Sequence, residues 1–482
     1  MFPLTQALAR SAVQFSQAPA MLGEEETWHL HGKRVAQRAA ILAARGFSRG
    51  DRLAIIGRNS AEQARVIHAC YWGGFLPVPI NWRLSAREIA EQLADCAPTL
   101  IVTDEAFEDL LPADLKRKHV LWRALTDDAA GVIDAVDANA DDPALLIYTG
   151  GTTGRAKGVV LSHGNIVANA FQVGAHMRFT GQSRYLHVAP MFHSADLLGT
   201  AVTILGGAHA FLPEFSPKAF VEAVDRHRIT HTMLPPTAIR FLLESEDTPQ
   251  HGTLKVLIYG SSAMDAASIV AACDRFEDVS LLQGYGLTET SPLLTILGAE
   301  AHQRILSGQD VLAGSAGRAL AGVELKLVDG EVLARGPNIA CAYWNRPEET
   351  AQSFQDGWFR TGDLGRIDDA GYLYLLGRSK DMIVTGGENV YAIEVERVLA
   401  MHPAIREAAV IGLPDPTWGE TVAAVIVAGE QPVDTDEIVQ HCRAHLGGFK
   451  VPRRIILRDD LPRSALGKVL KHVLKKDVEG TA

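Results

Sequence analysis

A glycine-rich stretch in the first third of the chain contains the residue types that bind an anion. Residues 148–157 read Tyr-Thr-Gly-Gly-Thr-Thr-Gly-Arg-Ala-Lys, and they follow an apolar run, 144–147, that is long enough for one buried strand. Glycines let backbone N–H groups approach a ligand, threonine hydroxyls donate hydrogen bonds, and Lys157 adds a positive charge. The stretch is not a Walker A loop, because two residues separate Gly154 from Lys157. These residues predict a phosphate-binding loop, and a plain Gly/Thr turn is the alternative.

The composition excludes several classes of protein. The chain has 482 residues, too many for one core, so two or more domains are expected. A net charge of -11 argues against non-specific binding of nucleic acid. Five widely spaced cysteines without a CxxC pair argue against a disulfide framework or a zinc site. The N-terminus lacks the apolar core of a signal peptide, and polar residues interrupt the longest apolar stretch, 187–212, so a cytoplasmic protein without a membrane span is predicted.

Helical and strand patterns alternate in the first hundred residues. A strand at 52–56 precedes a helix that Ser60 caps, and the next helix has Ser85 and Glu88 in capping-box spacing before a strand at 100–103. This β–α–β alternation predicts an α/β domain with a largely parallel sheet. Further strands are predicted at 184–189, 208–211, 230–234 and 256–259. They end in small residues or prolines, as strands at the rim of a ligand cleft often do.

The pattern changes twice in the last third of the chain. From residue 314 to about 374, short strands alternate with glycine-rich turns, which is typical of a small antiparallel sheet or barrel. A compact α+β pattern begins after Gly377. The predicted fold class is therefore α/β, with a large N-terminal domain (1–378) of α/β subdomains plus a small β-barrel-like subdomain (about 305–376), and a small, mobile α+β C-terminal domain (379–482).

Four further stretches join the glycine-rich one. They are Gln-Gly-Tyr-Gly-Leu-Thr-Glu-Thr at 283–290, Gly-Trp-Phe-Arg-Thr-Gly-Asp at 357–363, Gly-Arg-Ser-Lys-Asp-Met-Ile-Val-Thr-Gly-Gly-Glu-Asn at 377–389, and Pro-Arg-Ser-Ala-Leu-Gly-Lys at 462–468. Any one of them would be weak support, but five in this order are specific. From about residue 30 to 472 the chain strongly resembles the adenylate-forming superfamily of acyl-CoA synthetases, luciferases and peptide-synthetase adenylation domains.

The resemblance implies a two-step ligase that uses ATP, Mg2+ and CoA. A carboxylate first attacks the α-phosphate of ATP, which gives an acyl-adenylate and pyrophosphate. A thiol, usually that of CoA, then displaces AMP. Adenylation is needed because a carboxylate is a poor acylating agent. The site must therefore stabilise charge on phosphate oxygens and exclude water from a reactive anhydride.

The resemblance also implies a set of residues that contact the nucleotide and CoA. The set comprises Thr149, Gly150, Gly151, Thr152, Thr153, Gly154, Lys157, Gly260, Ser261, Ser262, Gln283, Gly284, Tyr285, Gly286, Asp363, Arg378, Lys380, Gly386 and Gly387. Within it, Thr153 and Lys157 contact the β- and γ-phosphates. Tyr285 stacks on adenine, and Asp363, near Arg378, accepts hydrogen bonds from both ribose hydroxyls.

The catalytic residues that the resemblance implies are Lys468, Glu289, Thr288 and His193. Lys468 bridges the substrate carboxylate and the α-phosphate, Thr288 contacts the α-phosphate, and Glu289 is the Mg2+ ligand. The C-terminal domain turns about Lys380 between the two steps, and residues 385–387 line the tunnel for the pantetheine arm of CoA. Taken singly, each of these residues has a plain alternative as a surface charge or part of a turn.

His193 helps to choose among the subfamilies. Amino-acid-activating relatives usually carry an aspartate after the equivalent of Phe192, whereas acyl- and aryl-CoA ligases carry a histidine or aromatic residue that gates the carboxylate pocket. A hydrogen-bonded histidine in a turn is the structural alternative. The other expected pocket residues are small or apolar, namely Met191, Ala195, Met233, Pro235, Ser261 and Leu293. We therefore expect an aromatic or medium-chain monocarboxylic acid, and this pattern does not separate cinnamate-type acids from fatty acids.

Three functions remain open at this point. The first is an acyl- or aryl-CoA ligase whose partners are a small-molecule carboxylic acid, ATP and CoA. The second is a stand-alone adenylating enzyme that loads an acyl carrier protein. The third is a nucleotide-binding regulator without catalysis, against which Glu289, Asp363 and Lys468 argue. A monomer or homodimer is expected, and a lysine acetyltransferase acting on Lys468 would inactivate the enzyme by removing the positive charge.

Overall fold

The computed structural model describes residues 1–126, 131–149, 156–247, 249, 252–262, 264–378, 381–385, 388–429, 431–463 and 469–479, without the side chain of Asp310. The chain divides into two compact units. The first comprises Met1–Leu325 and Ala334–Phe359, and the second comprises Lys326–Leu333 and Arg360–Ala482. This division passes through strand β20 (Trp358–Ile367), and the predicted domain boundary at 378–379 stays a prediction.

The first unit contains a nine-stranded sheet in the order β15-β14-β13-β12-β11-β9-β10-β1-β2. Its inner strands are parallel: β9 (Arg184–His187), β10 (Ala208–Phe211), β11 (His231–Leu234), β12 (Val256–Gly260) and β13 (Ser280–Tyr285). The outer strands are β1 (Pro19–Met21), β2 (Glu26–Thr27), β14 (Thr295–Leu297) and β15 (Arg318–Ala319). Because parallel strands end at one edge of a sheet, the segments that follow β9, β11, β12 and β13 share that edge.

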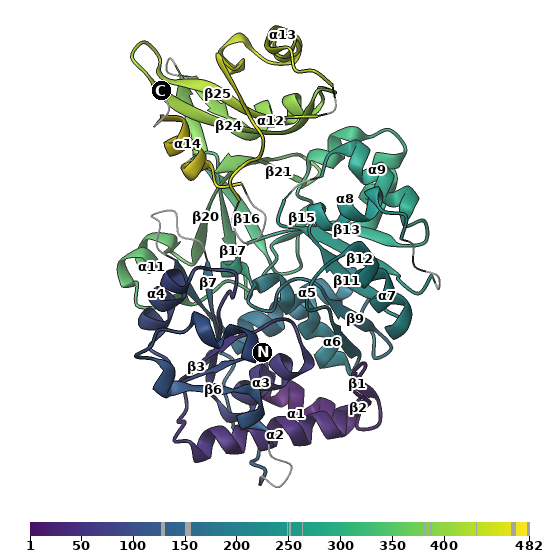
Figure 1. Ribbon diagram of the computed structural model, residues 1–482. Coiled ribbons are helices and arrows are strands. Elements are labelled where there is room, and N and C mark those ends of the chain that lie inside the picture. Colours follow the sequence, from purple (N-terminus) through teal and green to yellow (C-terminus); the bar gives the residue numbers. More distant parts are fainter. Residues whose placement is uncertain are drawn as a thin grey trace. The chain divides into compact units, whose positions relative to one another are not determined.

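Helices pack along this sheet. Figure 1 shows α7 (Pro217–His227), α8 (Pro236–Glu244) and α9 (Ala266–Arg275) beside strands β11, β12 and β13. The other helices near the sheet are α5 (His163–Met177), the short 3-10 helix η4 (Ser194–Gly199), α6 (Thr200–Leu205), the 3-10 helix η5 (Thr288–Thr290) and α10 (Ala299–Leu306).

A second sheet has the predicted β–α–β arrangement. Its parallel strands lie in the order β4-β3-β5-β6 and span Leu76–Pro79, Arg52–Ile56, Leu100–Thr103 and His119–Leu121. Ser60 caps α3 (Ala61–Gly73) through a hydrogen bond from the Gln63 N–H group. Ser85 and Glu88 form the predicted capping box at the start of α4 (Ala86–Cys96). The local sequence signals of this region are therefore confirmed.

The glycine-rich stretch connects two antiparallel strands. β7 (Pro143–Thr149) pairs with β8 (Lys157–Ser162), so that Thr149 lies opposite Lys157, and β18 (Ala342–Tyr343) adds to the far side of β8. This third sheet is antiparallel, unlike the parallel sheet that was predicted from the first hundred residues. Residues 150–156 separate the two strands, and so short a segment cannot form a crossover helix.

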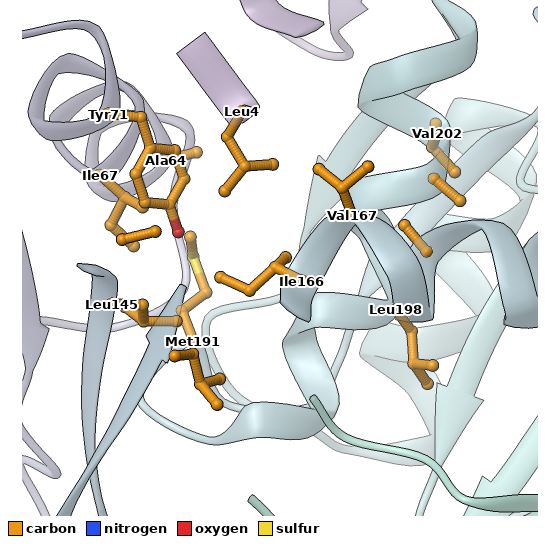
Figure 2. Close-up of a cluster of buried hydrophobic side chains, with 14 of the residues drawn as sticks. Leu4, Ala64, Ile67, Tyr71, Leu145, Ile166, Val167, Met191, Leu198 and Val202 are labelled. Atoms are coloured by element: carbon orange, nitrogen blue, oxygen red, sulfur yellow. The ribbon is translucent and has the colours of Figure 1, made fainter. Parts of the chain in front are cut away.

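The N-terminal helices were not fully predicted. Helix α2 spans Trp28–Ala44, and helix α1 (Leu4–Gln14), which precedes it, was not predicted. Its buried residues Leu4, Ala7, Leu8 and Ser11 have helical spacing, but Ser11 and the surrounding glutamines weaken the apolar pattern. In Figure 2 Leu4 lies in one cluster with Ile166, Val167, Leu198 and Val202. This cluster holds α1, α5 and η4 together through apolar contact.

The second unit contains the α+β pattern that was predicted after residue 377. Its sheet has the order β23-β22-β25-β24, with β26 parallel to β25. The strands are β22 (Met382–Thr385), β23 (Glu388–Tyr391), β24 (Ile405–Asp415), β25 (Gly419–Ala428) and β26 (Arg454–Arg458). The helices are α12 (Ala392–Ala400), α13 (Thr435–His445) and α14 (Lys471–Glu479). Val395, Leu399 and Ile426 are buried in its core.

Short strands and one helix stand between these two patterns. They are β16 (Glu324–Val328), β17 (Glu331–Arg335), α11 (Pro347–Ser353), β19 (Phe354–Gln355), β20 and β21 (Leu373–Arg378). In the second unit β20 and β21 form an antiparallel hairpin with Asp363 opposite Arg378. No helix in the described part of the chain is long and apolar enough to cross a membrane.

Several histidines of the first unit are buried without a charge. His163, 2% exposed, accepts a hydrogen bond at Nδ1 from the Leu4 N–H group, and His231, 6% exposed, donates from Nε2 to the Met177 carbonyl. Burial lowers the pKa of each imidazole to about 4, because the charged form loses its hydration. Both side chains are therefore neutral near pH 7.

We predict that acid destabilises this protein well above the pH at which carboxylates titrate. A histidine in the unfolded chain has a pKa of about 6.5. Below that pH the unfolded chain therefore binds protons that the buried histidines of the folded chain do not bind. The free energy of unfolding has its full value above about pH 6.5. At pH 5 each such histidine should lower it by about 1–2 kcal/mol. Thermal unfolding between pH 7.5 and pH 5 measures this. His231→Gln should lessen the fall in melting temperature, and a wild-type melting temperature that stays constant down to pH 5 would contradict the account.

Candidate functional site

The turn after β9 positions His193. This residue is the N-cap of η4, and its Nδ1 atom accepts a hydrogen bond of 3.2 Å from the Ala195 N–H group. Burial lowers the pKa of the imidazole to about 4. A neutral imidazole has one N–H group, and Nδ1 is an acceptor here, so the proton is on Nε2. His193 therefore presents a neutral hydrogen-bond donor, and not a positive charge.

The loop after β13 meets this turn. Thr288, in η5, has its Oγ1 atom 3.2 Å from the Ser194 Oγ atom, and both residues are buried. The structure thus brings the predicted residues His193 and Thr288 to the same edge of the sheet. Ser194, the residue after His193, makes the contact with Thr288. Asn338 holds the η5 loop from the other side by donating to the Thr290 and Leu293 carbonyls, each at 2.9 Å. Sequence reasoning missed Ser194 and Asn338.

Tyr343 connects Glu289 with Lys157. Its hydroxyl donates a hydrogen bond of 2.8 Å to Glu289 Oε1, and the Lys157 Nζ atom lies 5.0 Å from the centre of its ring. Lys157 also forms an ion pair of 2.6 Å with Glu349. Two residues predicted from separate stretches therefore lie on either side of one tyrosine. No signal in the sequence singled out Tyr343 or Glu349, because the antiparallel pairing of β18 with β8 creates this proximity.

Glycines let the backbone segments at this edge approach closely. A Cβ atom on Gly260 would lie 2.7 Å from the Gly284 carbonyl oxygen, and one on Gly286 would lie 2.1 Å from the Pro292 carbonyl oxygen. Ser261, which follows β12, has a left-handed backbone with φ of 73°. Side chains at Gly260 and Gly286 would keep these backbone segments apart. The ends of β12 and β13 and the η5 loop lie this close because both positions are glycine.

Tyr285 and Gln283 complete this edge. Gln283 is buried in β13, where the Tyr259 hydroxyl donates to its Oε1 atom at 3.4 Å. Tyr285, the last residue of β13, is partly buried and packs against the apolar core. Ser262 is exposed beside Ser261. The predicted adenine-side residues are thus gathered at the carboxyl ends of β12 and β13.

The second unit contains its own pair of predicted residues. Arg378 Nε lies 2.7 Å from Asp363 Oδ1, and Arg378 also donates to the Thr361 carbonyl. Asp363 is 6% exposed. The register of the β20–β21 hairpin places the two side chains together, and their role near the ribose stays a prediction.

Several predicted site residues lie outside the described residues. They are Gly150, Gly151, Thr152, Thr153, Gly154, Lys380, Gly386, Gly387 and Lys468. At the borders of the glycine-rich stretch, the Thr149 hydroxyl donates to the Lys157 carbonyl at 3.4 Å. At the border of the predicted pantetheine tunnel, the Thr385 hydroxyl accepts a hydrogen bond of 3.2 Å from Arg453.

A cavity of about 60 Å³ opens beside His193. Met191, Ile147 and Leu197 are among its apolar lining residues, and His68, His187, His209 and Asp196 are among its polar ones. Of the six expected pocket residues only Met191 lines this cavity. Ala195, Met233 and Leu293 are buried in the adjoining core, and Pro235 and Ser261 follow β11 and β12.

The donor set near Glu289 fits a magnesium ion that binds together with a nucleotide. Among the described residues no group of three or more His, Cys, Asp or Glu side chains could hold a metal ion. Mg2+ keeps several waters and is usually bound through one or two carboxylates plus phosphate oxygens. A single buried carboxylate, oriented by Tyr343, is what this arrangement requires from the protein.

Both parts of the chain match one family. Residues 8–344 match the model of the AMP-binding enzyme, and residues 394–468 match the model of the AMP-binding enzyme C-terminal domain. The chain belongs to the AMP-binding enzyme family. The resemblance drawn from five short stretches is thereby confirmed.

Relatives of this AMP-binding enzyme include CoA ligases for different acids. It is 36% identical to a feruloyl-CoA synthase of Amycolatopsis sp over 465 residues, which is 92% of each chain. It is 34% identical to a long-chain-fatty-acid–CoA ligase of Mycobacterium tuberculosis, over 93% of this chain and 92% of the relative. Its fold is similar to that of o-succinylbenzoate CoA synthetase from Bacillus subtilis in complex with an acyl-adenylate intermediate, with a TM-score of 0.88, 31% identity and 98% of each chain covered. The predicted fold class is confirmed.

We predict that the close backbone approach at Gly286 tolerates no side chain. Gly286→Ala should lower the free energy of unfolding by about 2 kcal/mol or more, because backbone atoms must move to admit the methyl group. Gly174→Ala is the matched control, since a Cβ atom there would be in ordinary contact with Ala201 at 3.7 Å. In the helix α5 it should stabilise by about 0.5–1 kcal/mol. Denaturant unfolding of both variants measures the difference, and equal stabilities would contradict the geometry.

Proposed function

We propose that this protein is an ATP-dependent acyl-CoA ligase that activates an aromatic or medium-chain monocarboxylic acid. The observation that carries this proposal is the similarity to CoA ligases over 92% of both chains, which includes the C-terminal domain. The named acids of the relatives are both aromatic and long-chain fatty, so the class of acid is proposed more broadly than for any one of them.

In the first step an oxygen of the substrate carboxylate attacks the α-phosphorus of ATP, and the bond to pyrophosphate breaks. Two anions approach each other, so the residues must reduce their repulsion. The Lys468 ammonium bridges the carboxylate and the α-phosphate, and the Thr288 hydroxyl contacts the α-phosphate. Lys157 leaves its ion pair with Glu349 and contacts the β- and γ-phosphates. Backbone N–H groups of residues 150–154 donate hydrogen bonds to the same phosphates. Mg2+, when bound by Glu289 and phosphate oxygens, supplies further neutralisation of charge.

The remaining nucleotide contacts of the proposal follow from the resemblance. Tyr285 stacks on adenine, with Gly260–Ser262 and Gln283–Gly286 forming the rim, and Asp363 accepts both ribose hydroxyls near Arg378. The Nε2–H group of His193 donates a hydrogen bond to the substrate carboxylate. Because the imidazole is neutral, it adds no positive charge that would hold the carboxylate back from the α-phosphorus. These residues bind and orient the reactants.

In the second step the CoA thiol attacks the acyl carbon, and the bond to AMP breaks, which gives the thioester. The C-terminal domain turns about Lys380 between the steps, and Thr385, Gly386 and Gly387 then line the pantetheine tunnel. Further parts of the proposal are a cytoplasmic location, a monomer or homodimer, and reversible inactivation by an acetyltransferase that acts on Lys468.

A screen of pyrophosphate release over carboxylic acids, with and without CoA, tests the proposal. Aromatic and medium-chain acids should release pyrophosphate slowly without CoA and rapidly with it. Release that depends on an acyl carrier protein and not on CoA would favour the carrier-loading alternative. Absence of release with every acid would contradict both.

We predict that Lys468→Ala separates the two steps. Adenylation should slow by about 2.7–4 kcal/mol if the loss resembles that of one oxyanion donor. Thioester formation from pre-made acyl-adenylate should stay near the wild-type rate, because the lysine acts only in the first step. Rapid-quench measurement of each half-reaction checks this, with Lys476→Ala in α14 as an exposed-lysine control. Wild-type adenylation, or equal loss of both steps, would refute the assignment.

We predict that Tyr343→Phe raises the Mg2+ concentration that adenylation needs and that Glu289→Gln abolishes adenylation. The tyrosine variant loses a hydrogen bond to a carboxylate, worth about 1.5–3 kcal/mol, so more Mg2+ should be needed for half-maximal ATP–pyrophosphate exchange. The control is Tyr374→Phe, which removes a hydroxyl that donates to Asp368 in the second unit. If both tyrosine variants need the same Mg2+ as the wild type, Glu289 is not oriented in this way.

A further inference from the structure

A chain of hydrogen-bonded side chains runs from Glu26 to the cavity beside His193. Glu26 Oε1 lies 2.7 Å from His31 Nδ1, and His31 Nε2 lies 2.8 Å from His68 Nδ1. His68 lines the cavity, on the same face of α3 as Ala64, Ile67 and Tyr71. Neither Glu26 nor His31 lines the cavity, so both act on it through His68.

This chain fixes where each proton lies. Burial alone would raise the pKa of Glu26, but hydrogen bonds from His31 and Arg65 lower it to about 2, so the carboxylate is ionised and only accepts. His31 must then donate from Nδ1. Burial lowers the pKa of His31 and of His68, so both are neutral and each has one N–H group. His31 Nε2 therefore accepts from His68 Nδ1–H, and His68 Nε2 is left with a lone pair.

The nitrogen atoms of the two neighbouring histidines have partners. His187 Nδ1 lies 2.5 Å from Asp196 Oδ1, and His187 Nε2 lies 2.9 Å from His209 Nδ1. His209 Nε2 lies 3.1 Å from the Thr203 hydroxyl oxygen. By contrast, His68 Nε2 has no protein partner in the described part of the chain. It is an acceptor in a cavity whose other walls include apolar side chains, such as Met191.

We propose that this cavity is the far end of the acyl-binding pocket and that His68 Nε2 accepts a hydrogen bond from a hydroxyl or N–H group at the end of the substrate remote from its carboxylate. The proposal rests on the proposed function. His193, the expected contact of the carboxylate pocket, and His68 line the same cavity, so one acid can reach both. The substrate class is then an aromatic acid with a ring hydroxyl or ring N–H group.

The size of the cavity agrees with this occupant. Its volume of about 60 Å³ exceeds the roughly 10–15 Å³ that one water needs, measured with the same kind of probe. It is therefore large enough for a polar substituent of the substrate. A site that hydrogen-bonds a substrate hydroxyl discriminates strongly against an analogue without it, because the buried acceptor is then left without a partner.

Three acids of one shape test the proposal: 4-hydroxycinnamic, 4-methoxycinnamic and cinnamic acid. The hydroxyl compound can donate, the methoxy compound can only accept, and cinnamic acid does neither. In wild-type protein kcat/KM for CoA-dependent pyrophosphate release should be about 10- to 100-fold higher for the hydroxyl compound than for the other two. Preference for the methoxy compound, or no preference, would overturn the proposal without any variant being needed.

His68→Phe should remove this discrimination, since phenylalanine has a similar shape and no acceptor. His231→Phe is the matched control, because it replaces another buried histidine that does not line the cavity, and it should keep the wild-type ratio. A His68→Phe variant that retains the ratio would mean that another group, such as Asp196, accepts the hydrogen bond, and the assignment to His68 would be wrong.

Different outcomes would contradict the proposed function and the assignment of His68. If the wild type releases pyrophosphate with other acids but shows no preference for the hydroxyl compound, the proposed function stands and the inference about His68 falls. If no carboxylic acid of a broad panel supports release, the proposed function falls and this inference falls with it.

Discussion

The close parallel packing of β12 and β13 is the constraint on which the site depends. Gly260 and Gly284 lie so near each other that a Cβ atom on the first would be 2.7 Å from the carbonyl oxygen of the second. Because of this close approach, Ser261 and Tyr285 lie at the same edge of the sheet. The η5 loop then folds back under Gly286, which brings Thr288 against the turn that carries His193. The site is assembled from strand ends, as in other open parallel sheets.

Charged side chains of the first unit have different kinds of partner near the predicted nucleotide residues and near the cavity. Among the predicted nucleotide residues, Lys157 has the protein partner Glu349, and Glu289 has the protein partner Tyr343. In the proposed function a bound polyanion and its cation replace or supplement these partners. Around the cavity, by contrast, Glu26 is a fixed anion held by His31 and Arg65, and the histidines beyond it stay neutral. Partners that a ligand can replace suit a site that exchanges ligands, whereas a hydrogen-bonded chain of neutral histidines suits recognition of a substituent.

Local and long-range features differed in how well the sequence predicted them. The capping box of Ser85 and Glu88 and the alternation of strands and helices depend on neighbouring residues, and they were predicted correctly. The family, the fold class and the type of enzyme were also predicted, since five ordered stretches suffice for that. The hydrogen bond of Tyr343 to Glu289 and the chain from Glu26 to His68 were not predicted. They join residues that only the packed sheets bring together, and no local pattern records them.

The fate of the carboxylate oxygen tests the central claim most directly. In an acyl-adenylate an oxygen of the acid is bonded to the α-phosphorus, and it stays with AMP when the thiol attacks the acyl carbon. Turnover of an acid labelled with oxygen-18 in both carboxylate positions, followed by mass spectrometry, therefore follows this oxygen. The account predicts one labelled oxygen in AMP and none in pyrophosphate. AMP without label, or label in a phosphate other than that of AMP, would contradict it.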